Sequence, residues 1–217
     1  MARPTAVILG GNRFPFHRIE RAGPTIARQL ERRGIDVDVT ADRDVLREDR
    51  ISAYDVLVDY TTDSTFTDEQ LAGLCSFVDS GGGYVGVHGA ADLTTTVDGS
   101  RDEPVPELRE LLGGHFLAHP EQTMFDVTVV DSYHPISADL NGFSVWDEPY
   151  VLEYDDDVRV LARMDHPKNG DVPVAWVTSF GDGRVFYCSL GHDIPALVTD
   201  GVQSVLARGI RWAARDS

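Results

Sequence analysis

A glycine run followed by a short apolar segment and a histidine constrains this chain more than any other stretch. Residues 81–92 read GGGYVGVHGAAD, so that glycines end one element, Tyr84 to Val87 are largely apolar, and His88 lies among small residues where the next element begins. This pattern is typical of a nucleophile elbow, a sharp turn between a strand and a helix that presents one side chain at the end of a sheet. We therefore expect a sheet whose strand end presents His88, where a hydrolase would present serine or cysteine.

Short apolar segments alternate with helical patterns through the first ninety residues. Most of these segments are bounded by glycine, proline or polar residues, as buried strands are. Strands are predicted over residues 6–9, 36–40, 54–59 and 84–87, and helices from about 24 to 34 and from 67 to 81. The second helix begins with a capping box, in which Thr67 is the N-cap and Gln70 follows three residues later. This alternation favours a parallel sheet that is covered by helices on both faces and binds ligands at the carboxyl ends of its strands.

The remainder of the chain adds signals for antiparallel strands. Two apolar segments flank the turn Phe180-Gly181-Asp182-Gly183, which is a strong hairpin signal. Strands are predicted over 125–130, 158–164, 173–177 and 184–190, with a loop over 94–106, a short helix over 107–112 and a final helix from about 195 to 214. No repeat or linker divides the sequence. We therefore expect one domain over residues 1–217, an α/β three-layer sandwich whose mostly parallel central sheet gains antiparallel strands in the C-terminal half.

Acidic residues outnumber basic residues by 36 to 19, which gives a formal net charge of −17. This balance excludes a nucleic-acid partner, because phosphate contacts need a basic surface. Heavy acidity with a single lysine, Lys168, is typical of adaptation to a salt-rich cytoplasm, where ions screen the repulsion between acids. No apolar run reaches the roughly 18 residues of a membrane-spanning segment. We therefore expect a cytoplasmic protein without a membrane partner, either a monomer or a homo-oligomer.

The residue at the elbow decides which chemistry is expected. An imidazole is a poor acyl carrier, so His88 is expected to act as a base, an acid, a hydrogen-bond donor or a metal ligand. Cys75 is predicted inside a helix and Cys188 inside a strand, so neither takes the elbow position of a cysteine-dependent amidotransferase. The strand at 184–190 leads into His192 and Asp193. Asp193 is predicted either to orient His192 or to cap the final helix.

A set of short motifs follows in order between residues 81 and 193. They are GVH at 86–88, GGHF at 113–116, HP at 119–120, HPI at 134–136, DEPY at 147–150, PVAW at 173–176 and LGHD at 190–193. The ordered set resembles the ThuA-like trehalose-utilisation family, which has a class I glutamine amidotransferase-like, flavodoxin-like fold. The resemblance implies a role in sugar utilisation on disaccharides oxidised to keto-sugars, with a small-molecule carbohydrate as the partner.

Other side chains are candidates for a crevice at the carboxyl ends of the parallel strands, where His88 is expected. Glu148 lies on a predicted loop and suits a general acid/base or a ligand. His115 and His119 are four residues apart and share a face if their segment is helical, whereas His134 and His166 are expected in turns. We predict catalytic roles for His88, Glu148, His192 and Asp193, and substrate contacts for His17, Tyr60, His119, Trp146 and Tyr150. Several imidazoles and a carboxylate can also bind a divalent ion such as zinc, although no ligand pair has a diagnostic spacing.

Two hypotheses of function follow from the sequence. The first is an enzyme that uses histidine and carboxylate acid–base or metal-assisted chemistry on a sugar, for example in isomerisation or elimination next to a carbonyl. The second is a non-catalytic binding or regulatory module that keeps an amidotransferase-like fold without its nucleophile. The enzyme hypothesis predicts that the strand-end histidines and Glu148 meet in one crevice, and the second predicts an apolar or filled crevice.

Overall fold

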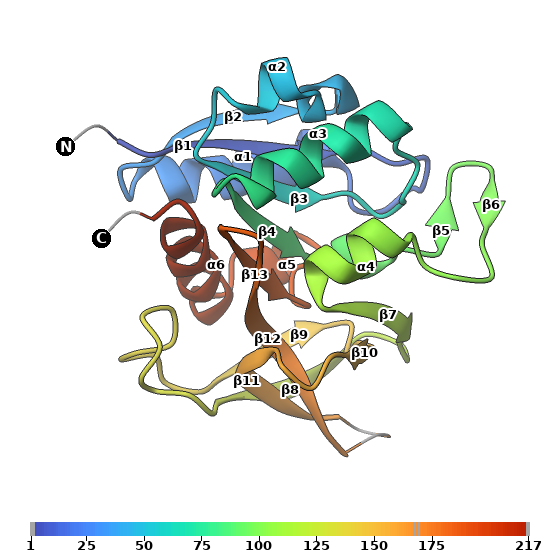
Figure 1. The fold of residues 1–217 in the computed structure, drawn as a ribbon. Helices are drawn as coiled ribbons and strands as arrows, with labels where there is room; N and C mark the ends of the chain where they lie inside the picture. The colour runs from blue at the N-terminus through green and yellow to red at the C-terminus, as the bar shows by residue number, and fades with distance from the viewer. Residues whose placement is uncertain (1–2, 167, 169, 216–217) are drawn as a thin grey trace.

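The computed structural model of the chain describes residues 3–166, 168 and 170–215. Within them, nine strands form one sheet in the order β2-β1-β3-β4-β13-β12-β11-β8-β9 (Figure 1). The strands of this sheet are β1 (Thr5–Gly10), β2 (Asp36–Thr40), β3 (Val56–Tyr60), β4 (Gly83–Val87), β8 (Thr123–Val129), β9 (Phe143–Asp147), β11 (Arg159–His166), β12 (Gly170–Phe180) and β13 (Gly183–Cys188). Two smaller ribbons pair β7 (Gly114–Ala118) with β10 (Val151–Tyr154) and β5 (Thr95–Thr96) with β6 (Gly99–Ser100).

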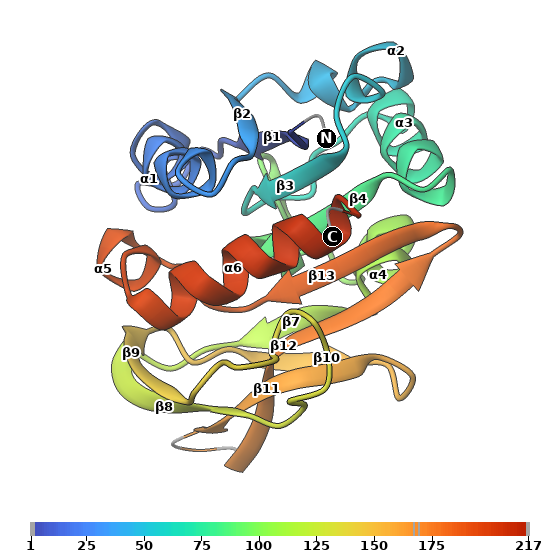
Figure 2. The ribbon, with the colours of Figure 1, turned by 90° about the vertical axis from the view of Figure 1, so that its left-hand side faces the viewer.

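The helices pack on both faces of the parallel strands. They are α1 (Ile19–Glu31), η1 (Arg43–Leu46), α2 (Glu48–Ile51), α3 (Asp68–Asp79), η2 (His88–Ala91), α4 (Pro106–Leu112), α5 (Ile194–Leu197) and α6 (Asp200–Ala213). Apolar side chains of α1 and α6 form one core with β1, β3, β4 and β13, and those of α3 and α4 form a second core on the opposite face. Figure 2 shows α6 lying along β13. No described helix has the length and apolar character of a membrane-spanning segment.

The sheet changes from parallel to antiparallel at β13. Strands β2, β1, β3, β4 and β13 pair in parallel, whereas β12, β11, β8 and β9 extend the sheet by antiparallel pairing. The hairpin from β12 to β13 turns at Gly181, whose φ of 55° lies in the left-handed region that glycine adopts without strain. This mixed architecture confirms the predicted α/β fold, with parallel central strands and antiparallel strands in the C-terminal half.

Several element boundaries differ from the prediction. Helix α1 begins at Ile19 and contains Pro24, because buried side chains on both sides of the proline hold the helix against the core. The predicted final helix is two helices, since Thr199 has an extended backbone and separates α5 from α6. The predicted loop over 94–106 contains β5 and β6. Strands β7 and β10 were not predicted, because their short, half-exposed segments lack a clear period, and β9 was not predicted although its residues alternate between buried and exposed.

Candidate metal centre and active site

His88 occupies the turn that the glycine pattern predicts. It follows β4 directly and opens η2, its side chain is buried, and its φ is 49°. A left-handed backbone is uncommon outside glycine and is found where surrounding structure enforces it, often at functional sites. His17, in the loop between β1 and α1, has the same property with a φ of 51°. Two buried histidines are therefore held in unusual backbone conformations after β1 and β4, the two strands that flank β3 in the sheet.

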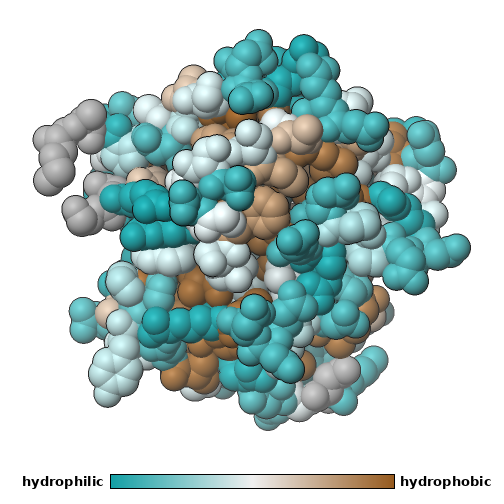
Figure 3. Space-filling model, in the orientation of Figure 1, coloured by the Kyte–Doolittle hydropathy of each residue, from teal (hydrophilic) through white to brown (hydrophobic). Residues whose placement is uncertain are grey.

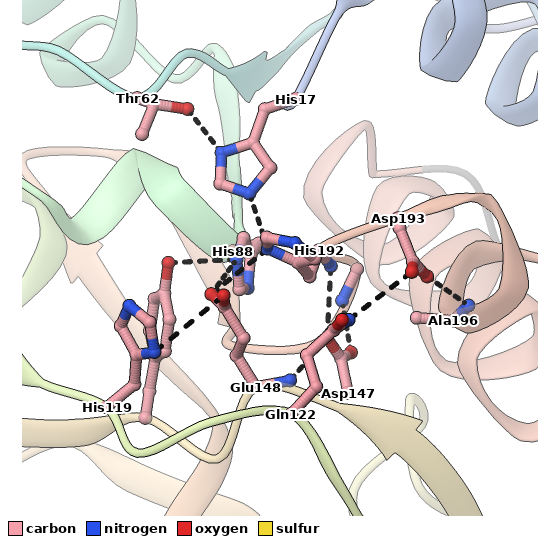
Figure 4. Close-up of polar contacts among 12 residues, drawn as sticks. His17, Thr62, His88, His119, Gln122, Asp147, Glu148, His192, Asp193 and Ala196 are labelled. Carbon is pink, nitrogen blue, oxygen red and sulfur yellow. Dashed lines mark hydrogen bonds and ion pairs between the residues drawn. The ribbon is translucent and has the colours of Figure 1, made fainter. Parts of the chain in front are cut away.

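Four side chains converge at the carboxyl edge of the parallel strands (Figure 4). They are His17, His88, Glu148, which follows β9, and His192, which lies between β13 and α5; one nitrogen or oxygen of each lies within 4.8 Å of the others. Nε2 of His17 lies 2.8 Å from Nδ1 of His192. Oε2 of Glu148 lies 3.0 Å from Nδ1 of His192 and 3.3 Å from Nε2 of His88. We call these four residues the His–Glu cluster.

The second ring nitrogens of two of these histidines are fixed by neighbours. Nδ1 of His88 donates to the carbonyl oxygen of Ser189 at 2.8 Å, so Nε2 is the unprotonated nitrogen in the neutral ring and faces the cluster. Nδ1 of His17 pairs with the hydroxyl of Thr62 at 2.7 Å. The hydroxyl of Tyr150 lies 2.9 Å from Nε2 of His88. Such contacts to the second nitrogen are the usual way in which proteins orient metal-binding imidazoles.

Asp147 joins the two loops that carry Glu148 and His192. Its buried carboxylate accepts hydrogen bonds from the backbone N–H groups of Gly191 at 2.7 Å, His192 at 3.2 Å and Glu148 at 2.9 Å. The hydroxyl of Tyr60 donates to the carbonyl of Gly191 at 2.8 Å. Asp147 was not among the predicted site residues. The alternation of FSVWD, which puts Val145 and Asp147 on the buried face of β9, is the sequence signal that predicts its burial.

Burial and mutual contacts set the charges of the cluster. Burial and the nearby imidazoles of His88 and His192 lower the pKa of His17 to about 2. Burial alone would raise the pKa of Glu148, but its contacts with the imidazoles of His192 and His88 hold it well below its usual range. Burial also opposes protonation of His192, but its contact with Glu148 outweighs this and raises its pKa. The cluster therefore combines an ionised carboxylate with at least one imidazole that stays neutral.

This donor set fits a divalent metal ion. Zinc lies about 2.0–2.1 Å from imidazole nitrogens, so tetrahedral ligand atoms lie roughly 3.3 Å apart. The contacts of 2.8, 3.0 and 3.3 Å within the cluster are close to this spacing. Three imidazoles and one carboxylate supply the nitrogen and oxygen ligands that zinc and other first-row metals prefer. His17, His88, Glu148 and His192 are thus the residues that could hold the ion.

The other predicted substrate contacts occupy different positions. Nδ1 of the partly exposed His119 lies 3.7 Å from Oε1 of Glu148, at the edge of the cluster. Tyr150 is buried against His88, and buried Tyr60 supports the backbone of Gly191. Trp146 lies on the exposed face of β9, opposite to Asp147, because neighbouring strand residues point to opposite sides of a sheet. The predicted contact of Trp146 with the crevice is therefore wrong.

Asp193 does not orient the imidazole of His192. Its carboxylate accepts from the N–H of Ala196 at 3.0 Å and from the side chain of Gln122 at 3.3 Å, so it is the N-cap of α5. Glu148 takes the position beside His192 that was predicted for Asp193. The capping role, which was the second prediction for Asp193, is the one that the structure supports.

The remaining histidines lie outside the cluster. His115 belongs to β7 and His119 follows that strand, so they share no helical face. His134 is buried beside Trp212, with ring centroids 5.0 Å apart. His166 was expected in an exposed turn, but it ends β11, is buried, and its Nε2 donates to the carbonyl of Pro149 at 3.1 Å. His166 thereby supports the loop that follows Glu148.

The two cysteines lie apart from the elbow. Cys75 is on α3, and Cys188 is in β13 beside Val87. Burial raises the pKa of Cys188 to about 12, so the thiol stays protonated. Neither side chain is placed or charged as the nucleophile of an amidotransferase.

The fold and the cluster define a three-layer α/β protein with an amidotransferase-like elbow that presents histidine within a buried histidine–carboxylate centre. The model of the ThuA family, described as trehalose utilisation, matches residues 6–213, and the chain belongs to this family. The predicted resemblance is thereby confirmed over nearly the whole chain. A search among curated proteins finds no match.

Solved structures share this fold. A ThuA-like protein from Parabacteroides merdae is 20% identical, with 99% of this chain and 90% of that chain covered and a TM-score of 0.79. A ThuA-like protein from Bacteroides uniformis is 22% identical, with 97% and 91% covered and a TM-score of 0.77. A β-galactosidase from Rahnella sp. R3 is 18% identical, with 94% of this chain and 30% of that chain covered and a TM-score of 0.70. At these identities the matches show the fold alone.

Proposed function

We propose that this chain is a metal-dependent enzyme that moves a proton next to a carbonyl group of a carbohydrate. The observation that carries the proposal is the convergence of His17, His88, Glu148 and His192 from four separate loops. Burying several polar and charged side chains together costs desolvation free energy, because each buried polar atom needs a partner. Such groups are therefore concentrated at functional sites. The family description, trehalose utilisation, supports a sugar as the substrate.

A bound divalent ion would supply a Lewis acid that polarises a carbonyl oxygen. The four cluster residues, His17, His88, Glu148 and His192, would hold this ion as its ligands. Tyr150 is suited to donate a hydrogen bond to a substrate oxygen, because burial raises the pKa of its phenol well above the ordinary value and keeps the proton in place. His119, partly exposed and 3.7 Å from Glu148, is placed to exchange protons with solvent.

The first test measures the metal. Protein purified without a histidine tag should retain about one zinc or similar ion per chain, and Glu148→Gln and His17→Gln should each weaken zinc binding by about 100-fold or more. His134→Gln is the matched control, because His134 is a buried histidine outside the cluster and should leave the affinity unchanged. Isothermal titration of metal-free protein gives these affinities.

The second test measures the reaction with 3-keto-disaccharides. The metal-loaded protein should convert them, and Tyr150→Phe should lower kcat by about 100-fold while zinc stays bound, the usual scale for a proton donor. Wild-type protein that binds no metal and neither binds nor converts any sugar would overturn the proposal.

A non-catalytic module is the second candidate function. The observation in its favour is the β-galactosidase match, in which this fold corresponds to 30% of a longer chain. This candidate predicts that Glu148→Gln changes metal binding without changing any partner or sugar affinity. Turnover by the wild-type protein would exclude it.

A further inference from the structure

A hollow of about 140 Å³ lies directly beside the His–Glu cluster. It lies among the loop after β1, the first turn of α1 and the start of α5. Its lining includes Phe16, Arg18, Arg21, Tyr60, His192 and Asp193. His192 is shared between the two sites: its Nδ1 faces Glu148 in the cluster while its ring borders the hollow. A ligand in the hollow would therefore contact the side of the metal centre.

The hollow carries two arginines that are not neutralised by acids. Arg21 has no side-chain hydrogen bond or ion pair to any residue among 3–166, 168 and 170–215, and Arg18 reaches only the carbonyl of Pro15, at 3.4 Å. Some arginines of the chain pair with carboxylates, as Arg109 does with Asp155 at 2.8 Å, whereas Arg18 and Arg21 form no such pair among the described residues. Two guanidinium groups without a carboxylate partner therefore line the same hollow, where they are available to an anion.

One carboxylate also lines the hollow. Asp193 accepts from the N–H of Ala196 and from the side chain of Gln122 (Figure 4), and it forms no ion pair with Arg18 or Arg21 among the described residues. The hollow therefore has two guanidinium donors in its lining, with the charged carboxylate of Asp193 at its edge. Guanidinium groups bind carboxylates and phosphates through paired, charge-assisted hydrogen bonds.

An aromatic ring stands beside these arginines. Phe16 is 42% exposed, and its ring stacks on that of Phe14 at 5.1 Å with an interplanar angle of 2°. The same ring lies 6.2 Å from the ring of His192. The stack holds Phe16 in place, and its ring belongs to the lining of the same hollow as the two arginines. Such a face suits the C–H face of a pyranose ring.

We propose that this hollow is the subsite for a sugar that carries an anionic group, a carboxylate or a phosphate. Phe16 packs against the sugar ring, Arg18 and Arg21 bind the anion, and the shared residue His192 places the ring next to the metal centre. The inference rests on the proposed function, because it assigns the substrate class of the same site.

The test compares the binding of glucose 6-phosphate, glucuronate and glucose to the zinc-loaded protein by isothermal titration, in the lowest KCl concentration that keeps the chain folded. At least one anionic sugar should bind about tenfold more tightly than glucose, and the better of the two identifies the anion. Arg21→Gln and Arg18→Gln should each remove most of this preference while the affinity for glucose stays the same. Arg28→Gln, on the exposed side of α1 and outside the hollow, is the matched control and should change nothing.

A fourth variant tests the aromatic face. Phe16→Ala should weaken all three sugars by a similar factor. Equal affinity for the three sugars, or an anion preference that survives both arginine variants, would overturn the subsite while leaving the proposed sugar enzyme intact. Absence of binding by every sugar, together with absence of bound metal, would overturn the subsite and the proposed function together.

Discussion

The buried histidines of this chain differ in what their second nitrogen contacts. In the cluster, His88 donates from Nδ1 to a carbonyl, so the lone pair of Nε2 faces Glu148 and the hydroxyl of Tyr150. His134, in contrast, uses Nδ1 to accept the backbone N–H of Ile136 at 3.3 Å. The first arrangement positions a ligand, and the second closes a turn. Residue type alone does not separate these roles, but the hydrogen-bond partner does.

His134 should make the stability of the fold depend on pH. Burial, and to a smaller extent Arg159, lowers the pKa of His134, so the unfolded chain binds a proton before the folded chain does. The contribution of neutral His134 to the free energy of unfolding is therefore fully present above the ordinary histidine pKa of about 6.5. It is lost as the pH falls below that value, by at most about 1.4 kcal/mol per pH unit. His134→Gln keeps an acceptor for Ile136 and does not titrate. Urea unfolding at constant salt should show that the free energy of unfolding falls less between pH 7.5 and 5.5 in this variant than in the wild-type protein. An equal fall in both proteins would contradict the prediction.

The sequence was sufficient to select most of the site because strand ends are visible in it. His17, His88 and His192 each follow an apolar run, and Glu148 adjoins a proline-containing turn, so topology alone brings them towards one edge. Thr62 was not predicted because a residue that supports a ligand through hydrogen bonds leaves no spacing pattern, and Asp147 was not predicted because strand β9 was not recognised. Trp146 was misplaced because β9 was not predicted, and the strand alternation decides which face its side chain takes.

At the scale of elements, the parallel half was predictable and the antiparallel half less so. Strands β1, β3 and β4 are fully buried apolar runs that end at turn residues, which is a strong signal. Strands β7 and β10 pair with each other outside the main sheet, and each is four or five residues long. Their pairing depends on tertiary contacts that no local pattern records.

Gly89 links two elements that form the site. A Cβ at this position would lie 2.8 Å from Oγ1 and 3.1 Å from Cγ2 of Thr62, whose hydroxyl holds His17. Gly89→Ala should therefore push β3 and η2 apart, lower the unfolding free energy by about 1–3 kcal/mol and weaken zinc binding. Chemical unfolding and zinc titration measure both effects. Thr62→Ser in the Gly89→Ala background removes the methyl carbon at 3.1 Å, keeps the hydroxyl at 2.8 Å and should restore part of both effects. A Gly89→Ala variant with wild-type stability and zinc affinity would show that the contact is unimportant.

At the scale of the whole molecule, charge rather than apolar packing is the unusual property. Hydrophilic residues occupy much of the face in Figure 3, and the formal net charge is −17. Several arginines pair with carboxylates, but the acidic residues outnumber the basic ones, so the remaining carboxylates repel one another across the surface. Repulsion of this kind acts on the compact state more than on the unfolded chain, because folding brings the charges closer together.

Salt should therefore stabilise the fold. The Debye length falls from about 10 Å at 0.1 M to about 3 Å at 1 M, so repulsion across the surface is nearly removed by molar KCl. We expect the Tm to rise by about 10 °C between 0.1 and 1 M KCl, which corresponds to a few kcal/mol for a chain of this length. Screening saturates near 1 M KCl, whereas the exclusion of salt from the protein surface continues to act above this concentration. If the plot of Tm against KCl concentration flattens near 1 M, the increase in Tm is due to screening of charge repulsion.

The double variant Asp156→Asn/Asp157→Asn removes two exposed charges between β10 and β11 and should raise the Tm at 0.1 M KCl more than at 2 M KCl. A Tm that is independent of KCl, or a double variant with the same effect at both concentrations, would show that surface repulsion does not limit the stability of this protein.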